Sequence, residues 1–314
     1  MYHPYFRGKQ YELIAIRECA SLLKSAGFSP IIEPVKQATS GLKKTLQCIV
    51  DANAKAIVIV NPFHGELSGN TDVIADFIAN EFNGHDNIRP AILLTEETSI
   101  EEVKYSYQKI KDFDSLVFIH AGYKSPQLIL DEIISNPSQA DIEHVFHDKK
   151  SGKLYRRHFK KSHRVLLRDG FEKTSNRKYP EVESFSELHV TFEDEGMDGF
   201  GDFLTVGDEY SETGGPAYAV AIHITFIDKD KDDEMHIHHF KSIRQDDPKD
   251  PAGKFAEALH KLIAELNKPD CKIFNTEAIK EFRDLHSREH FPGLGYVKKL
   301  SMKHHLETLA KYFE

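Results

Sequence analysis

The chain has 314 residues, of which 40% are hydrophobic, and this proportion supports a buried core and excludes a largely disordered chain. Its 50 acidic and 41 basic residues give a formal net charge of −9, which excludes nonspecific binding to a polyanion through overall charge but leaves room for a local basic patch. No apolar run approaches the ~20 residues that cross a bilayer, and the candidate Ala54–Val60 is interrupted by Lys55.

The cysteines indicate the compartment in which the chain works. Cys19, Cys48 and Cys271 are far apart, they form no CxxC motif, and the N-terminus does not resemble a secretory leader. This usage is typical of a reducing environment. We therefore expect a soluble, cytoplasmic protein with no membrane contact.

Short runs of β-forming residues recur along the chain, separated by helical patterns. Most of these runs are almost entirely apolar, as is typical of strands covered on both faces. In chain order, the predicted strands are Pro30–Val35, Ala56–Val60, Pro90–Leu94, Leu116–His120, Ile142–Phe146, Arg164–Arg168, Phe203–Val206 and Ala217–Ile227.

The segments between the predicted strands carry helix signals. Leu42, Leu46 and Ile49 share one helical face, and Ser99 with Glu102 forms a capping box at the start of another predicted helix. A further helix is expected to open at Ser125 and Pro126. After residue 250 the pattern becomes wholly helical. Its apolar faces are formed by Phe255, Leu259 and Ile263, by Ile279 and Phe282, and by Leu306, Leu309 and Phe313.

Strands that alternate with helices predict a parallel sheet with crossover helices. Eight predicted strands favour an α/β fold of the (β/α)8 TIM-barrel-like type, although an open doubly wound sheet would show the same alternation. No helix fits between the last two strands, where the chain reads GDEYSETGGP, so we expect an irregular closure. We predict a single barrel-like domain over residues 1–314, with 251–314 as a helical C-terminal extension.

The segment EMHIHHF, Glu234–Phe240, resembles a metal site because His236 and His238 share one face of a strand. However, the preceding DKDKDDE is typical of a turn, which predicts a hairpin with the histidines on a sheet rim. No CxxC or HExxH motif completes a tetrahedral ligand set. We therefore expect no metal here and no cofactor elsewhere, and we expect the adjacent pair His304 and His305 to lie on the surface.

In a barrel, catalytic groups stand at the carboxyl ends of the strands. The polar residues at these positions include acids, bases and a cation, so proton transfer on an anionic substrate is one interpretation. The other is that strand ends are polar wherever loops meet water. The predicted catalytic residues are Glu33, Asn61, His120, Arg168 and Asp202. Other polar residues at the strand ends are Lys36, His64, Thr95, Glu96, His147, Asp148, Asp169 and Asp208.

The basic run Lys153–Arg164 interrupts this acidic chain. Its cations are three or four residues apart, so one helical face would carry most of the charge. A contact with nucleic acid or an acidic partner is one interpretation, and a solvated helix face, which we favour, is the other. The side chains that would make the contact are Arg156, Arg157, Lys160 and Lys161.

The opening string MYHPYFRGKQYELIAIRE places Arg7 and Lys9 just before a predicted helix. Glu12 falls in the first turn of that helix, where a carboxylate favours the helix dipole. Arg7 and Lys9 could reach over the barrel mouth and pair with Glu33 or Asp202. We therefore predict that Arg7 and Lys9, together with Lys36, bind the substrate.

The same string resembles that of a family of uncharacterised bacterial proteins that open with a YxPYxRGKQxELxAxRE-like motif. The resemblance extends to FGDFLTVGD, Phe200–Asp208, and a more distant likeness connects the chain to the beta protein family, from which it departs at Phe203. The matching residues are Tyr5, Arg7, Gly8, Lys9, Gln10, Glu12, Glu33, Gly201 and Asp202.

Genes of this family usually lie beside one that encodes a nuclease-like protein with an EIK signature. The resemblance implies a protein partner encoded nearby. It predicts a partner or regulatory component of a two-protein bacterial module, with phage defence as one such role. The alternative is a TIM-barrel enzyme that acts on a small anionic or phosphorylated substrate, and a structural scaffold is a third interpretation.

Overall fold

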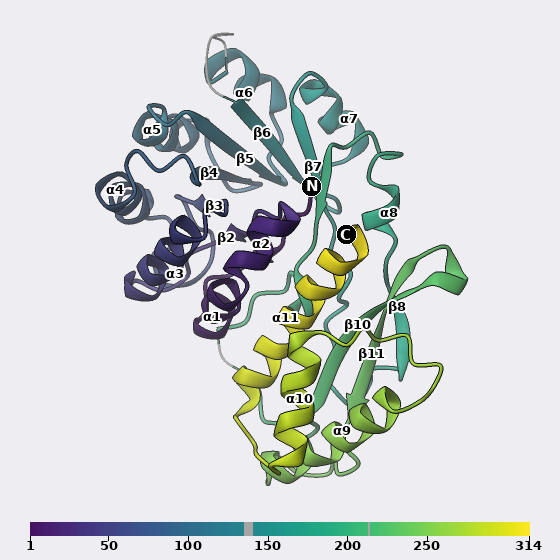
Figure 1. Ribbon diagram of the computed structural model, residues 1–314. Helices are drawn as coiled ribbons and strands as arrows, with labels where there is room; N and C mark the ends of the chain where they lie inside the picture. Colours follow the sequence, from purple (N-terminus) through teal and green to yellow (C-terminus); the bar gives the residue numbers. More distant parts are fainter. Residues whose placement is uncertain (135–140, 213) are drawn as a thin grey trace. The chain divides into compact units, whose positions relative to one another are not determined.

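The computed structural model describes residues 1–134, 141–212 and 214–314, and the chain divides into two compact units (Figure 1). Unit 1 contains Met1–Arg168 and Thr191–Asp202. Unit 2 contains Asp169–Val190 and Phe203–Glu314. The chain therefore enters unit 2 twice, once between two strands of unit 1 and once after the last of them. The prediction of one domain over 1–314 stays a prediction.

Unit 1 is an α/β barrel built on eight parallel strands, which confirms the predicted fold class (Figure 1). Neighbours in the sheet follow the order of the chain, as they do in a (β/α)8 barrel. The strands are β1 (Tyr5–Phe6), β2 (Ile31–Ile32), β3 (Ala56–Ile59), β4 (Ile88–Thr95), β5 (Ser115–Ala121), β6 (Asp141–His147), β7 (His163–Leu167) and β9 (Gly199–Gly201).

Helices connect the successive strands from β1 to β7 and lie outside the sheet (Figure 1), whereas the chain reaches β9 from β7 by way of unit 2. The predicted capping box is confirmed, because Ser99 Oγ accepts from Glu102 N at 3.2 Å and Glu102 Oε2 accepts from Ser99 N at 2.7 Å. The helices are α1 (Gln10–Glu18), α2 (Ala20–Ala26), α3 (Ser40–Asp51), α4 (Thr71–Glu81), α5 (Ile100–Ile110), α6 (Pro126–Glu132) and α7 (Lys153–Arg156). Short 3₁₀ turns are η1 (Gly65–Leu67) and η2 (Arg157–Phe159).

The barrel is nearly closed, with one irregular seam between β9 and the chain's first residues. Tyr2 and Phe200 form an isolated parallel bridge, and Tyr5 N donates to Asp202 O at 2.9 Å. A Cβ atom on Gly201 would lie 2.3 Å from His3 O, so only glycine permits this close approach. The glycines of GFG therefore allow the N-terminal segment to seal the sheet.

Unit 2 is an antiparallel sheet of order β10-β11-β8, covered by helices (Figure 1). The predicted hairpin is confirmed, because β10 pairs antiparallel with β11 through the turn η4. The elements of this unit are β8 (Val182–Ser186), η3 (Leu204–Val206), β10 (Ala221–Asp228), η4 (Lys229–Lys231), β11 (Glu234–Lys241), α9 (Pro251–Leu266), α10 (Glu277–Ser287) and α11 (Leu294–Phe313). The one-turn helix α8 (Leu188–Thr191) ends where the chain returns to unit 1.

The core of unit 2 forms where the three long helices meet one face of the sheet. Ile222 and Ile224 of β10 pack with Phe255 of α9, Phe282 of α10 and Leu300 of α11. The amphipathic patterns predicted after residue 250 are thus confirmed as helices.

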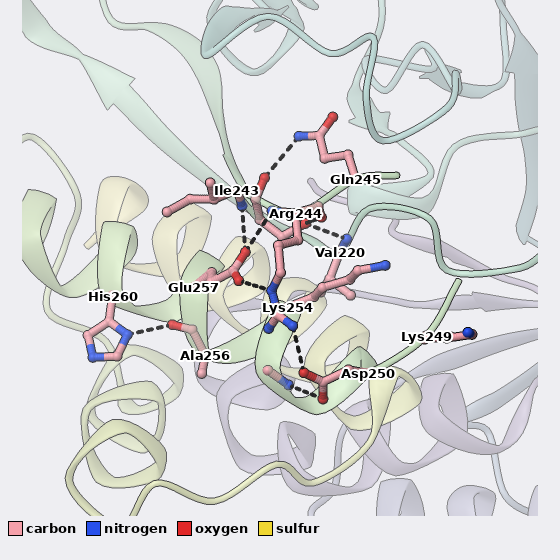
Figure 2. Close-up of polar contacts among 12 residues, drawn as sticks. Val220, Ile243, Arg244, Gln245, Lys249, Asp250, Lys254, Ala256, Glu257 and His260 are labelled. Atoms are coloured by element: carbon pink, nitrogen blue, oxygen red, sulfur yellow. Dashed lines mark hydrogen bonds and ion pairs between the residues drawn. The ribbon is translucent and has the colours of Figure 1, made fainter. Parts of the chain in front are cut away.

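The start of α9 is held by a polar cluster (Figure 2). Arg244 donates to Asp250 Oδ2 at 2.9 Å and also pairs with Glu257, while Asp250 caps the helix by accepting from Gly253 N. Lys254, almost fully buried, donates to Ala217 O at 3.2 Å. These bonds satisfy the first backbone donors of the helix and tie the preceding loop to it.

Two predicted barrel strands are wrong. Where a strand was predicted over Phe203–Val206, residues Leu204–Val206 form a 3₁₀ turn. The strand predicted over Ala217–Ile227 forms as Ala221–Asp228, but it belongs to the antiparallel sheet of unit 2 rather than to the barrel. Two strands that the sequence did not predict, Tyr5–Phe6 and Gly199–Gly201, take their places. The predicted number of barrel strands was therefore correct, but two of the predicted strands were not.

The histidine predictions also need correction. His304 and His305 are fully buried rather than on the surface, because His304 Nε2 bonds Thr225 O at 2.8 Å and His305 Nδ1 lies 3.0 Å from Thr225 Oγ1. The histidines of EMHIHHF lie on β11, the central strand of the sheet, and not on a rim. Across the described ranges, no helix has the length and apolar character needed to span a membrane.

Candidate functional site at the barrel mouth

The five predicted catalytic residues all lie at the carboxyl edge of the parallel sheet. Glu33, Arg168 and Asp202 directly follow β2, β7 and β9; Asn61 comes two residues after β3; and His120 is the penultimate residue of β5. Because all eight strands are parallel, these positions share one end of the barrel. The side chains, however, are held by different sets of neighbours.

Glu33 is the centre of the most elaborate cluster at this edge. It is fully buried, and its Oε2 accepts from Tyr5 Oη at 2.8 Å and lies 3.2 Å from Arg7 Nη1. Its Oε1 accepts from the backbone N–H groups of Phe63 and His64 at 2.9 and 3.0 Å, and the His64 ring Nδ1 lies 3.1 Å away. The predicted pairing of Arg7 with Glu33 is confirmed.

These partners keep Glu33 ionised. Burial alone would raise its pKa, but the hydrogen bond from His64, the charge of Arg7 and the hydrogen bond from Tyr5 outweigh it and lower the pKa to about 2. The guanidinium of Arg7 also lies over the Tyr5 ring, 4.7 Å from its centroid. Glu33 is therefore a fixed carboxylate rather than a group that exchanges protons near neutral pH.

The loops after β2 and β3 are fastened together around this carboxylate. Glu66 N donates to Val35 O at 2.9 Å, and Gln37 N donates back to Glu66 Oε2 at 3.0 Å. Gly65 has a φ of 78°, and a Cβ atom there would lie 2.3 Å from Val35 O. The sequence HGE thus turns the chain so that His64 faces Glu33.

His64 is the group in this cluster that can do chemistry. Because Glu33 is ionised and can only accept, His64 in its neutral form donates from Nδ1, which makes Nε2 the basic nitrogen. The His64 side chain is 26% exposed while Glu33 has no exposure. A buried carboxylate that orients a partly exposed imidazole is the arrangement of a general base.

Asn61 and His120 are held by other contacts. Asn61 uses both ends of its amide on β4, with Nδ2 donating to Leu93 O and Oδ1 accepting from Leu93 N, each at 2.8 Å. His120 bonds Tyr155 Oη at 2.8 Å and His144 Nδ1 at 2.9 Å. Its ring also lies 4.7 Å from that of Phe159 in η2, which places His120 on the helix side of the sheet. Burial lowers the pKa of His120 well below its usual value.

Arg168 and Asp202 complete the predicted set. Arg168 binds Asp148 Oδ2 at 2.7 Å and Glu195 Oε1 at 3.3 Å, so two acids already neutralise its charge. Asp202 accepts from Tyr2 Oη at 2.7 Å. The catalytic roles of Asn61, His120, Arg168 and Asp202 stay predictions.

The three predicted substrate-binding cations differ in their surroundings. Arg7 is nearly buried against Glu33, whereas Lys36 is exposed and pairs with Glu66 Oε1 at 2.9 Å. Lys9 is half-buried and forms the N-cap of α1, with its backbone N–H bonding Glu12 Oε2 at 3.4 Å. All three follow β1 or β2 and therefore lie at the same edge as Glu33.

The basic run does not form the predicted helical face. Its helix α7 is a single turn followed by η2, and Arg156 is buried and pairs with Asp148 at 3.4 Å. Arg157, Lys160 and Lys161 are exposed. The cations do not line up on one helical face, because the helix is too short to align them over three turns.

The histidines of EMHIHHF are paired with carboxylates. His236 Nε2 lies 2.9 Å from Glu234 and His239 Nε2 lies 2.9 Å from Glu183. Among residues 1–134, 141–212 and 214–314, no group of three or more metal-ligating side chains could hold an ion. The prediction that this segment binds no metal stays a prediction that elemental analysis can test.

A scan of protein-family models, a search of curated proteins and a search of solved structures give no match to this chain. The resemblance to the bacterial family therefore stays a prediction, and the site rests on its own geometry.

The sequence indicated part of this site. Glu33 and Arg7 were predicted from strand ends and from the opening string. His64 stood among the polar strand-end residues but was not selected, and Tyr5 was named only as a residue that matches the family motif. The signal that could have favoured His64 is the HGE turn, since a histidine before a glycine in a short strand-to-helix loop can be turned back to the strand edge.

Proposed function

We propose that unit 1 is an enzyme that acts by proton transfer on a small anionic or phosphorylated substrate at the carboxyl edge of its barrel. The observation that supports this most is the bond between the buried, ionised Glu33 and Nδ1 of the partly exposed His64. Active sites of (β/α)8 enzymes lie at this edge. The fold is compatible with many chemistries, so the proposal rests on the dyad rather than on the barrel.

Each residue of the cluster has a distinct role in this proposal. Nε2 of His64 is the base. Glu33 is a positioning residue that fixes the tautomer of His64 and stabilises the imidazolium that forms when His64 takes up a proton. Arg7 balances the charge of Glu33, so that the dyad does not repel an anion. Lys9 and Lys36, on the loops that follow β1 and β2, would attract the anionic group.

Inorganic phosphate, titrated into ¹⁵N-labelled protein, tests the anion site. We expect the amide signals of Phe63 and His64 to shift and to saturate, and we expect Lys36→Gln to weaken the binding. Lys24→Gln, an exposed lysine in α2, is the matched control and should leave the titration unchanged. Shifts confined to other parts of the chain, or equal effects of the two variants, would contradict the proposal.

A second proposal is that the chain is the partner or regulatory component of a two-protein bacterial module, working with a nuclease-like protein in a role such as phage defence. The sequence resemblance suggests this role, and one surface feature favours it. Residues 149–164 contain eight Lys or Arg residues and no Asp or Glu. Within the described part of the chain, Arg157, Lys160 and Lys161 form no ion pair. Such a segment would suit an acidic surface or a nucleic-acid backbone.

Charge reversal of this segment tests the second proposal. Arg157→Glu with Lys160→Glu changes exposed side chains and spares the buried Arg156, so the fold should be retained. We expect the double variant to weaken co-purification with the neighbouring nuclease-like protein, and the more so at low salt. Lys24→Glu with Lys44→Glu, two exposed lysines on α2 and α3, is the matched control. Unchanged capture would reject this surface, and binding of labelled RNA or DNA alone would assign it to nucleic acid instead.

A further inference from the structure

A line of three ionisable side chains crosses the small sheet of unit 2. His223 on β10 is directly opposite His239 on β11, and β8, which carries Glu183, is the next strand. The His223 and His239 Nδ1 atoms are 2.7 Å apart, and His239 Nε2 lies 2.9 Å from Glu183 Oε1. The strand order β10-β11-β8 therefore assembles a His–His–Glu chain on one face.

Two aromatic rings fix the orientation of this chain. Tyr179 stacks on His239 with ring centroids 4.4 Å apart, and Phe171 meets His223 edge-on at 5.0 Å. Tyr179 is itself anchored, because its Oη accepts from Thr174 N at 3.0 Å. The two imidazole planes are inclined by 76° to each other, and the flanking aromatic rings hold each of them in place.

The direction of the hydrogen bonds follows from the carboxylate. An ionised Glu183 can only accept, so His239 donates from Nε2 and its Nδ1 carries a lone pair. That lone pair accepts the Nδ1 proton of His223. The basic nitrogen at the end of the chain is therefore Nε2 of His223, which is half-buried.

We propose that Glu183, His239 and His223 form a proton relay that makes Nε2 of His223 a general base toward a neutral hydroxyl compound, either water or an alcohol. The hydroxyl proton moves to Nε2 of His223, the Nδ1 proton of His223 moves to Nδ1 of His239, and the Nε2 proton of His239 moves to Glu183. The products are a hydroxide or alkoxide and a neutral carboxyl group, and no electrons are transferred.

The surroundings keep the relay in the state that this role requires. Burial lowers the pKa of His239 to about 4 and that of His223 well below its usual value, so both rings are neutral near pH 7. Burial also raises the pKa of Glu183, which makes the carboxylate a better proton acceptor. A His–His–Glu chain with only a structural role would make the same hydrogen bonds between these groups. The test must therefore measure the chemical reactivity of His223.

Diethyl pyrocarbonate is the probe, because it acylates an unprotonated imidazole nitrogen, here Nε2 of His223. The reaction is complete only when the ring loses the proton on its other nitrogen, Nδ1, which the relay would accept. Modification rates at each histidine would be measured by peptide mass spectrometry at pH 7. We expect Glu183→Gln to slow modification of His223 by roughly tenfold or more, and Glu183→Asp to restore much of the rate. His260, an exposed histidine in α9, should react at the same rate in every variant.

A matched control lies in the same sheet. Glu234 pairs with His236 Nε2 at 2.9 Å, so Glu234→Gln removes a carboxylate–histidine contact elsewhere in the sheet and should leave His223 unchanged. An unaltered His223 rate in folded Glu183→Gln, or no reaction at His223 in the wild type, would overturn the proposal. If Glu183→Gln does not fold, ¹⁵N NMR of the wild type decides: an Nε2–H tautomer of His223 would overturn the relay. None of these measurements involves the barrel mouth.

Discussion

Replacement of Glu33 by Gln should remove a pH-dependent contribution to the stability of unit 1. The pKa of Glu33 falls from its ordinary value of 4.5 to about 2 in the folded protein, where the carboxylate is fully buried. At ~1.36 kcal/mol per pKa unit, this difference stabilises the folded state by about 3 kcal/mol. The structural source is the set of partners that includes Arg7 and His64.

The sign of the pH dependence follows from the lowered pKa. The stabilisation is fully present above pH 4.5, where the unfolded carboxyl group is ionised, and it is lost as the pH falls toward 2. Glu33→Gln should therefore be less stable than the wild type at pH 7 by about 3 kcal/mol, a loss that also reflects the buried charge of Arg7 left without its partner. The difference between the two proteins should shrink at pH 3.

Urea denaturation followed by circular dichroism at pH 7 and pH 3 measures this difference. Glu96→Gln is the matched control, because Glu96 is an exposed carboxylate after β4 at the same edge of the barrel. Its free energy of unfolding should differ from that of the wild type by no more than about 0.5 kcal/mol at both pH values. If Glu33→Gln matched the wild type at pH 7, or if its deficit were the same at pH 3, the account of Glu33 as a fixed carboxylate would be refuted.

Three further substitutions test other parts of the fold by urea denaturation. Gly201→Ala places a Cβ atom 2.3 Å from His3 O and should destabilise the barrel seam by about 1–3 kcal/mol, so a neutral effect would contradict the close approach. Lys254→Met removes a buried donor to Ala217 O and should cost about 1–3 kcal/mol, and a stabilising effect would show instead that desolvation of the ammonium dominates. Asn61→Ala leaves two β4 backbone groups without their partner and should cost about 2 kcal/mol, whereas a negligible loss would argue that water replaces the amide.

The barrel could be predicted because six of its strands are buried apolar runs separated by helices with clear start signals. The strands at the seam could not. Tyr5–Phe6 is too short to form a run, and Gly199–Gly201 reads as a loop because glycine weakens strand propensity. The hairpin strand Ala221–Asp228 has ideal strand composition, but sequence composition does not tell which sheet a strand joins.

The sequence predicted which edge of the barrel carries the site, but not which side chains meet there. The rule that catalytic groups follow parallel strands placed Glu33 and His120 at the same end of the barrel, yet their side chains have different surroundings. Successive residues of a strand face opposite sides of the sheet, so a shift of one position exchanges the barrel side for the helix side. The partners of Glu33 come from loops whose path depends on turns such as that at Gly65, and their convergence is visible only in three dimensions.

The tautomer of His64 tests the central claim most directly. In long-range ¹H–¹⁵N NMR spectra of the protein at pH 8, the account predicts a proton on Nδ1 and an unprotonated Nε2, because ionised Glu33 accepts at 3.1 Å. Glu33→Gln should weaken this preference, while Glu96→Gln should not. A wild-type His64 protonated on Nε2, or a tautomer indifferent to Glu33→Gln, would contradict the proposal that Glu33 orients a general base at the barrel mouth.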